Sequence, residues 1–535
     1  MSEWKLIWHQ ALTCSPKHGK VVGKDKTIIF TVHTPASATG LRIRFTNRLG
    51  EAPYQIGRMA VAARESLYPV KREGKTEFEI PVGQTVWSDA LPIALEAGED
   101  IEIRMYFESD IADCNMIEEE AHLYMGDHVY GATEAAKESN FAKRTGIFPP
   151  VPAIEAVEIQ TEEELSAIVA FGDSITAMSR WTKPLSARLE QAYQGKYALL
   201  NSGISGNCLL YKVPGMLGDL FGDEGVKRFQ QDVLDVPNLK AVIIALGVND
   251  VSYLTKKTAG LINKETFIQE IQKITQTLHE RGVRVVMQTI SPRLGVARRM
   301  GKYTQAMEDL RLELNDWIRS ASMFDYVFDA ETVVSEKHKD GLYYKEGLHQ
   351  GDHLHPNFEG GRALAEAYDL DQLTGRFSVC QIGDPEEKSR IARIVLEALQ
   401  EWFEVPETRE GYIRDSANWP FFAAFVEDQP VGFLCLKETG KATVELAVMG
   451  VLKEYHRYGI GRALFHKARQ SAAEQGYEFL QVKTVQMGCY EDYDATNRFY
   501  QALGFKEFEV MPMFWDEANP CQIYVMHLKG ESENE

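Results

Sequence analysis

A serine, an aspartate and a histidine in two short segments have the types and spacing of a catalytic triad. Ser174 lies in GDSIT at 172–176, directly after the apolar run AIVAFG. A serine at the carboxyl end of a parallel strand can act as a nucleophile when a base reaches it. In DHLHP at 352–356, Asp352 precedes His355 by three residues, and a helical or turn-like backbone places both side chains on one side. Asp352 can then accept a hydrogen bond from one ring nitrogen of His355 while the other faces Ser174, as in a serine hydrolase.

These residues also have plainer interpretations. A serine after a strand is often only a helix cap. Asp352 would likewise serve as a cap if a helix begins near Asn357. His349 and His353 lie close to His355 in the sequence and are alternative bases.

Two further segments follow strand-like runs and offer hydrogen-bond donors to developing negative charge. SGISGN at 202–207 can aim the Gly206 amide into the site, and GVND at 247–250 presents Asn249. With the Ser174 amide, these make three donors for an oxyanion. A tight turn would explain Gly206 alone, and a loop-stabilising amide would explain Asn249 alone. Four such segments in one order favour an active site.

The order GDSIT, SGISGN, GVND and DHLHP resembles the SGNH superfamily, also called GDSL hydrolases, from Gly172 to His355. The resemblance implies a flavodoxin-like fold and hydrolysis of acyl esters, with no cofactor or metal. It also implies a triad of Ser174, Asp352 and His355. The chain has no GxSxG motif, which argues against the ordinary α/β-hydrolase fold.

A second group of residues, HRYGIGRAL at 456–464, has the composition of a phosphate-binding turn. Gly459 and Gly461 let successive amides point at one spot at the start of a helix, where phosphate oxygens bind. From residue 453 to 469 there are five basic residues and one acidic residue, so the net charge is 5 − 1 = +4. The alternative is an amphipathic helix with a solvated basic face.

Residues from about 385 to 528 resemble the GNAT superfamily of acyl-CoA-dependent acetyltransferases. The resemblance implies an acetyl-CoA site in which Tyr500, in FYQALGF, protonates the CoA thiolate; the alternative is that Tyr500 is only a core aromatic residue. Tyr493 replaces an asparagine common in the family, and Glu445 is a candidate base. The residues implied to bind the cofactor are Val448, Gly450, His456, Arg457, Gly459, Ile460, Gly461 and Arg462, with His456 standing where the family has Gln or Arg.

Three successive patterns must position these groups. Apolar and polar residues alternate over about the first 150 residues, as in TIIFTVHT and IEIRMYF, which predicts an antiparallel β-sandwich. Apolar strands then alternate with helices, including one at 265–282, which predicts a three-layer α/β domain. From about residue 379 onward, the pattern of strands and helices predicts an α+β domain. The predicted domains are a jelly-roll-like sandwich at 1–162, a hydrolase at 163–378 and an acetyltransferase at 379–535.

The alternating segment at 41–62 resembles the β-sandwich fused to some bacterial GDSL esterases. The resemblance implies that this domain walls or selects the substrate, with carbohydrate esters or lipids as candidates. A structural lid is the alternative. FPPVP at 148–152 marks a seam, because prolines block strand pairing.

Composition restricts the partners of the chain. Its 535 residues are 44% hydrophobic and 25% charged, as in globular proteins, and the net charge is 58 − 78 = −20. An acidic chain lacks the charge pattern of a nucleic-acid or anionic-membrane binder. The apolar runs are far shorter than the roughly 20 residues that span a bilayer, and the N-terminus shows no signal peptide. Seven scattered cysteines without CxxC predict neither disulfides nor zinc, so we expect a cytoplasmic protein.

The sequence therefore predicts a bifunctional enzyme that hydrolyses an acetyl or short-chain ester, an acetylated carbohydrate among the candidates, and acetylates an amine from acetyl-CoA. One alternative is an esterase whose C-terminal domain only binds acetyl-CoA as a sensor. Another is that the first 150 residues form a glycan-binding module.

Overall fold

The computed structural model describes residues 2–13, 25–49, 52–108, 121–127, 129–130, 153–214, 218, 221–296, 303–321, 323–426, 428–456 and 460–528. The chain divides into two compact units, Met1–Tyr368 and Asp369–Glu535. The proline-rich segment at 148–152 lies outside the described residues.

The N-terminal region consists of antiparallel sheets, as predicted. Trp8 of one sheet packs against Phe30 of the other, with ring centroids 5.3 Å apart. The first sheet has the order β1 (Glu3–His9), β11 (Ile154–Thr161), β3 (Gly40–Thr46), β8 (Thr85–Trp87). The second has the order β10 (Ala121–Met125), β2 (Lys26–Thr34), β9 (Glu99–Phe107), β5 (Met59–Ala63), β6 (Ser66–Pro69), and β4 (Tyr54–Ile56) pairs with β7 (Phe78–Ile80). Since β11 lies between β1 and β3, this region needs the chain as far as Thr161.

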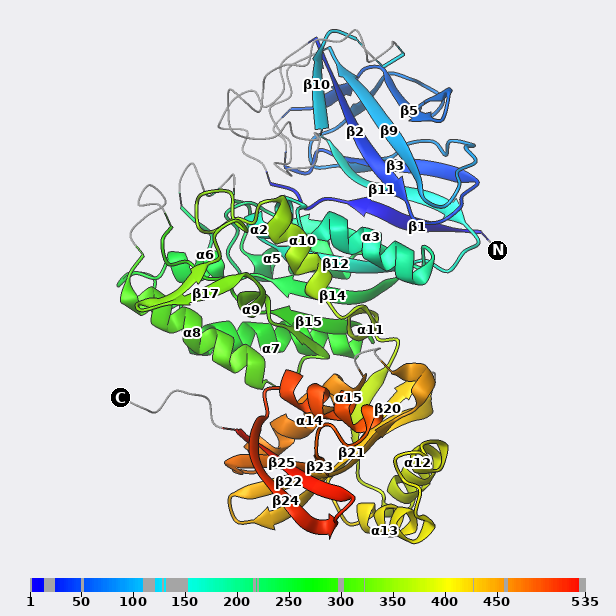
Figure 1. The fold of residues 1–535 in the computed structure, drawn as a ribbon. Coiled ribbons are helices and arrows are strands. Elements are labelled where there is room, and N and C mark those ends of the chain that lie inside the picture. The colour runs from blue at the N-terminus through cyan, green and yellow to red at the C-terminus, as the bar shows by residue number, and fades with distance from the viewer. Residues whose placement is uncertain are drawn as a thin grey trace. The chain divides into compact units, whose positions relative to one another are not determined.

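The central region is a five-stranded parallel sheet with helices on both faces (Figure 1). Its order is β13 (Tyr197–Gly203), β12 (Ser166–Gly172), β14 (Leu239–Ala245), β15 (Arg284–Gln288), β16 (Tyr326–Phe328). Numbered along the chain, this is the 2-1-3-4-5 order of flavodoxin-like folds, so the predicted three-layer α/β fold is confirmed. The principal covering helices are α3 (Thr182–Tyr193), α7 (Lys264–Glu280), α8 (Gln305–Ser320) and α10 (Phe358–Ala367).

The N-terminal sheet adjoins the central sheet through the end of β1. Gln10 forms a parallel bridge with Asn201 at β13, and the ring Nδ1 of His9 lies 3.2 Å from Ser202 Oγ. Both His9 and Gln10 are buried. Burial, reinforced by nearby arginines, lowers the pKa of His9 to about 3, so this contact holds a neutral imidazole at neutral pH. The sandwich and the parallel sheet therefore form one packed unit.

The C-terminal unit is a seven-stranded mixed sheet, and the predicted α+β class is confirmed. Its order is β19 (Ser378–Ile382), β20 (Phe421–Val426), β21 (Gln429–Gly440), β22 (Thr443–Val451), β23 (Phe479–Val485), β25 (Asn519–His527), β24 (Lys506–Asp516). Its helices are α11 (Leu370–Thr374), α12 (Pro385–Ala398), α13 (Pro406–Ser416), α14 (Ile460–Glu474) and α15 (Glu491–Ala502). Phe421 and Phe422 point to opposite faces of the sheet, so one joins the core beneath α12 and the other the core beneath α14.

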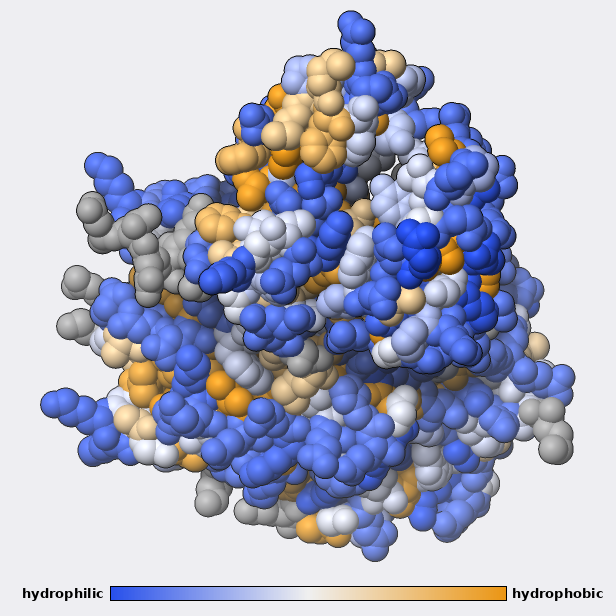
Figure 2. Space-filling model, turned by 90° about the horizontal axis from the view of Figure 1, so that it is seen from below, coloured by the Kyte–Doolittle hydropathy of each residue, from blue (hydrophilic) through white to orange (hydrophobic). Residues whose placement is uncertain are grey.

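The surface agrees with the composition. Figure 2 shows a mostly hydrophilic face on which apolar residues gather in separate groups. Within the described ranges, every helix is too short or too polar to cross a lipid bilayer.

We predict that removing residues 2–162 destabilises the parallel sheet. The truncated chain exposes the edge of β13 that β1 covers. Its free energy of unfolding should fall by at least about 2 kcal/mol, since burying one large apolar side chain contributes about 1.5–3 kcal/mol. Urea unfolding followed by tryptophan fluorescence measures this change. Fragment 369–535 is the control and should unfold at the same urea concentration as this unit does in the full chain. An unchanged unfolding midpoint for residues 163–368 of the truncated chain would show that the sandwich is dispensable.

Candidate active sites

The carboxyl end of β12 leads directly into the predicted nucleophile. Ser174 is the first residue of helix α2 (Ser174–Ala177), and its Oγ lies 2.8 Å from Nε2 of His355. Nδ1 of the same ring lies 2.6 Å from Oδ2 of Asp352. The structure therefore brings the three predicted side chains into one hydrogen-bonded series. Ser174 and His355 are each 9% exposed, so the series is buried but still reaches the surface.

Ser174 and Asp352 are not the residues that cap the neighbouring helices. Asp173, not Ser174, caps α2, because its carboxylate accepts from the Ile175 amide. Asn357 caps α10 by accepting from the Gly360 amide. Neither Ser174 nor Asp352 is needed for these caps.

Asp352 fixes the orientation of the His355 ring and leaves Nε2 able to accept a proton. Its Oδ1 accepts from the amides of Leu354 and His355, each at 3.0 Å. Burial alone would raise the pKa of Asp352, but hydrogen bonds from the His355 ring and from these backbone amides hold it well below its usual range. An ionised carboxylate accepts the Nδ1 proton of His355, so Nε2 keeps a lone pair for the serine hydroxyl.

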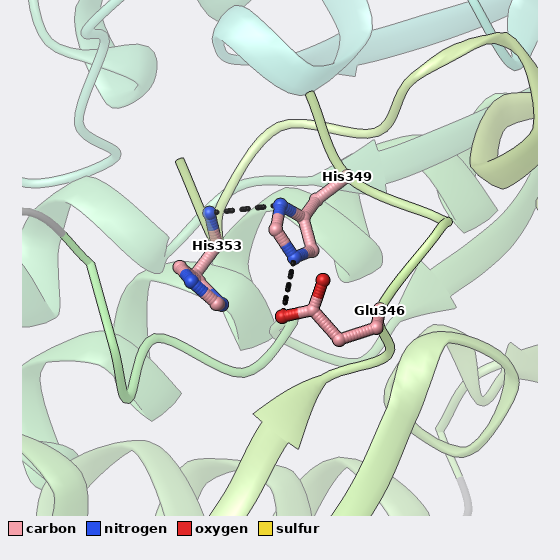
Figure 3. A group of neighbouring side chains, drawn as sticks. All are labelled: Glu346, His349 and His353. Atoms are coloured by element: carbon pink, nitrogen blue, oxygen red, sulfur yellow. Dashed lines mark hydrogen bonds and ion pairs between the residues drawn. The ribbon is translucent and has the colours of Figure 1, made fainter. Parts of the chain in front are cut away.

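His349 organises the same loop from its centre (Figure 3). Its Nδ1 accepts from the backbone amides of Gly351 and His353 at 3.0 and 3.2 Å. Glu346 lies three residues before His349, the same spacing that Asp352 has to His355. Spacing therefore does not separate these two histidines as bases, whereas the contact with Ser174 does.

Glu346, His349 and His353 are, among the residues described, the one group of potential ligand side chains close enough for a metal ion, with ligand atoms within 4.8 Å. A ligating histidine nitrogen must be unprotonated, and the other ring nitrogen usually donates to an acceptor. Here Nδ1 of His349 instead accepts two backbone hydrogen bonds, which leaves the proton on Nε2, 3.6 Å from Glu346. This donor set fits an ordered loop better than a metal site.

The two predicted oxyanion segments contact each other. Nδ2 of Asn249, in α6 (Val248–Ser252), donates to the carbonyl of Asn207 at 3.0 Å, beside Gly206. Gly206 has φ +77°, and a Cβ there would come within 2.4 Å of the Phe221 ring, so this position requires glycine. The Ile204 amide donates to the Gly172 carbonyl, which places this loop beside the Ser174 segment.

Asp250 and Arg228, which the motif analysis missed, hold this loop in place. Asp250 accepts from the amides of Leu209 and Leu210, each at 2.8 Å, and burial raises its pKa to about 6. Buried Arg228 lies over the Phe171 ring. Its four acceptors are the carbonyls of Gly172 and Ser202, Oδ1 of Asn207 and the carboxylate of Asp232. A possible sequence signal was the i,i+4 pair of Arg228 and Asp232.

In the C-terminal unit, two neighbouring parallel strands separate. β22 and β23 pair only from Thr443↔Phe479 to Leu446↔Val482. The strand β22 continues to Val451, so its segment with Val448 and Gly450 lies beyond this pairing. That segment still pairs with β21 on its other side.

The predicted phosphate-binding turn is described only in part. Arg457 and Gly459 lie outside the described residues. Ile460 is buried at the start of α14, Gly461 follows close to Met449 and Phe499, and Arg462 lies in the first turn. The ring of His456 is tied to the end of β22 by a 2.8 Å contact between Nε2 and the Val451 carbonyl.

The candidate acid and base of this unit have contrasting surroundings. Tyr500 belongs to the core and packs against Phe505 and Tyr524; burial raises its pKa, so the phenol keeps its proton. Glu445 forms an ion pair with Lys483, so its carboxylate already has a charged partner. The hydroxyl of Tyr493 donates to the Trp402 carbonyl at 3.4 Å.

Comparisons with known proteins identify two domains. Residues 170–363 match the GDSL-like lipase/acylhydrolase family, and residues 391–505 match the acetyltransferase (GNAT) family, which confirms both resemblances. A putative GNAT acetyltransferase from Desulfovibrio desulfuricans is 20% identical, covers 29% of this chain and 99% of its own, and has a TM-score of 0.26. A GNAT acetyltransferase from Elizabethkingia anophelis with acetyl-CoA bound is 15% identical over 28% of this chain and 98% of its own, with a TM-score of 0.23. No curated protein gives a significant match.

We predict that Arg228→Met destabilises the unit by about 3–5 kcal/mol, because it leaves the buried Asp232 carboxylate unpaired. Urea unfolding of the full chain measures the loss. The double variant Arg228→Met/Asp232→Leu should regain part of it, since no buried charge then remains. A loss within the about 0.5 kcal/mol typical of surface substitutions would contradict the role of Arg228.

Proposed function

We propose that this chain, with a GDSL-like acylhydrolase domain at 170–363 and a GNAT domain at 391–505, is a bifunctional enzyme. The first domain hydrolyses a small acyl ester, and the second transfers an acetyl group from acetyl-CoA to an amine. The observation that carries the hydrolase proposal is the bonded series of Ser174, His355 and Asp352.

In the proposed acylation step, Nε2 of His355 takes the proton of Ser174 while Oγ attacks the ester carbonyl. Asp352 stabilises the imidazolium that forms. His355 then returns the proton to the leaving alcohol, and the acyl group remains on Ser174. Water, activated by the same ring, hydrolyses this acyl-enzyme and releases the acid.

Negative charge on the carbonyl oxygen is stabilised by the amides of Ser174 and Gly206 and by Asn249. A carboxamide NH₂ has two hydrogens, and Asn249 uses one of them for the Asn207 carbonyl. The other is then free to face the oxyanion. The existing bond fixes the amide in advance, so little reorganisation is needed during the reaction.

We predict that Ser174→Ala lowers kcat for p-nitrophenyl acetate by at least about 10⁴-fold, because no acyl-enzyme can form. A fluorophosphonate should label the unmodified chain at Ser174 and fail to label the variant. The matched control, Ser320→Ala at the exposed end of α8, should keep both activity and labelling. A Ser174→Ala chain with most of its activity would exclude Ser174 as the nucleophile.

The acetyl-CoA proposal rests on the family match and on the separation of β22 from β23. A strand edge released from its neighbour offers backbone groups to an extended ligand. The following helix, α14, has 15 residues and begins after this strand, so its positive N-terminal end suits a pyrophosphate. Tyr500 would supply the proton for the CoA thiolate.

The sensor alternative has its own support. Glu445 is ion-paired, and Tyr500 lies among core rings. A domain without a free base would bind acetyl-CoA and not turn it over. The two alternatives differ in turnover and not in binding.

We predict that the Ser174→Ala chain, in which ester hydrolysis cannot consume the thioester, binds acetyl-CoA with a Kd below about 1 mM, the upper end of common enzyme affinities. Calorimetry measures binding, and thiol release with a panel of amines measures transfer. Adding Tyr500→Phe should leave binding unchanged and slow transfer by about 10²–10⁴-fold, the usual contribution of a general acid. Binding without transfer to any amine would favour the sensor, and no binding would exclude both.

A further inference from the structure

Arg293, in the loop after β15, is a buried arginine that is only 5% exposed. Within the part of the chain that the structure describes, its buried Nε and Nη1 atoms have no hydrogen-bond partner. A guanidinium stays protonated in proteins and carries five N–H donors. Burying such a charge without a partner is strongly unfavourable. An unpaired arginine in this position therefore needs an explanation.

The other buried arginines of the same unit, within the described residues, are fully engaged. Arg228 has four acceptors, and Arg311 bonds to Glu308, Glu331 and the Ile290 carbonyl. These two arginines show how this fold treats a structural guanidinium. Arg293 departs from that pattern.

None of the described groups that face Arg293 forms an ion pair with it. Its electrostatic neighbours are Tyr303, Asp173, Tyr253 and Cys208, and burial lowers the pKa of Arg293 itself. Asp173 directs Oδ1 to the Ile175 amide, and burial raises its pKa to about 7. Tyr303 donates its hydroxyl to Glu308, and its ring centroid lies 5.8 Å from the guanidinium carbon.

Arg293 lies beside the proposed hydrolase site. It follows β15 at the same sheet edge at which β12 ends before Ser174. Its neighbour Leu294 bridges to Tyr343, and a Cβ on Gly295 would lie 3.3 Å from Cγ of His353. The loop of Arg293 therefore contacts the loop that carries Asp352 and His355.

We propose that Arg293 binds a carboxylate on the substrate, so that the hydrolase acts on small esters that carry a negative charge. This inference rests on the proposed role of Ser174 as the nucleophile. A carboxylate matches the planar fork of a guanidinium and can accept two parallel hydrogen bonds. It would supply the partners that Nε and Nη1 lack, and it would do so only when substrate is bound. Arg293 is thus a residue that determines specificity.

The test compares neutral and anionic esters on the full chain. p-Nitrophenyl acetate is the neutral ester, p-nitrophenyl hydrogen succinate carries a carboxylate on the acyl side, and 4-acetoxybenzoate carries one on the alcohol side, with phenyl acetate as its neutral counterpart. We expect kcat/KM for at least one anionic ester to exceed that of its neutral counterpart by about tenfold or more. Arg293→Met should lower kcat/KM for that anionic ester by about 10–100-fold, the loss expected for a charged hydrogen bond, and change the neutral esters by less than about threefold.

Two further variants separate local recognition from net charge. Arg293→Lys keeps the charge without the fork and should give an intermediate loss. Arg362→Met removes an exposed arginine of α10 and should preserve the anionic preference. Equal losses for neutral and anionic esters in Arg293→Met would overturn the inference.

A folding defect in Arg293→Met would still leave the inference testable. Free succinate should competitively inhibit hydrolysis of p-nitrophenyl acetate by the unmodified chain, and absence of both inhibition and anionic preference would overturn the proposal. If fluorophosphonate labels Ser174 and neutral esters are hydrolysed without such a preference, only the role of Arg293 fails. If Ser174 is not labelled and no ester is hydrolysed, the proposed hydrolase function itself fails.

Discussion

The guanidinium of Arg228 is the contact on which the proposed hydrolase site depends. Catalysis by a serine needs a nucleophile and an oxyanion loop in fixed relation, yet the segments proposed for these roles lie at the ends of two different strands. Arg228 bonds to the last carbonyl of β12, to a carbonyl near the end of β13 and to Asn207. Its charge is balanced by Asp232, so a buried polar junction connects the ends of the two strands from which the Ser174 segment and the Gly206 loop begin. His349 has a comparable role for the histidine loop, through two backbone hydrogen bonds.

The sequence predicted the features that depend on short-range patterns. Apolar runs of strand length located β12, β14 and β15, and the first and last of the four short motifs located Ser174 and His355, which are in contact. Asp352 and His355 were predictable because their contact lies within one turn. The prediction of His355 rather than His349 as the base could not rest on spacing, because Glu346 precedes His349 by the same three residues. The contact with Ser174 separates the two rings.

Long-range features were beyond such patterns. The contact of Gln10 with Asn201 joins segments 191 residues apart (201 − 10), and no local periodicity encodes it. Helix α13 buries few residues, chiefly Ile413 and Ser416, so its apolar pattern was too weak to read. Arg293 looks ordinary in the sequence, because the absence of a partner is a property of its surroundings. The environment of Tyr500, deep in its core, likewise follows from strands that converge from distant positions.

The pairing of β1 with β11 has a consequence for how the chain acquires its structure during synthesis. Glu3 pairs with Thr161, so β1 waits for 158 further residues (161 − 3) before its partner exists. Its other contact, at β13, requires about 40 more. Until then the apolar edge formed by Leu6, Ile7 and Trp8 remains open to other nascent strands. On the ribosome, β1 is thus made long before it becomes protected, an interval in which chaperones or rapid collapse of neighbouring hairpins would shield it.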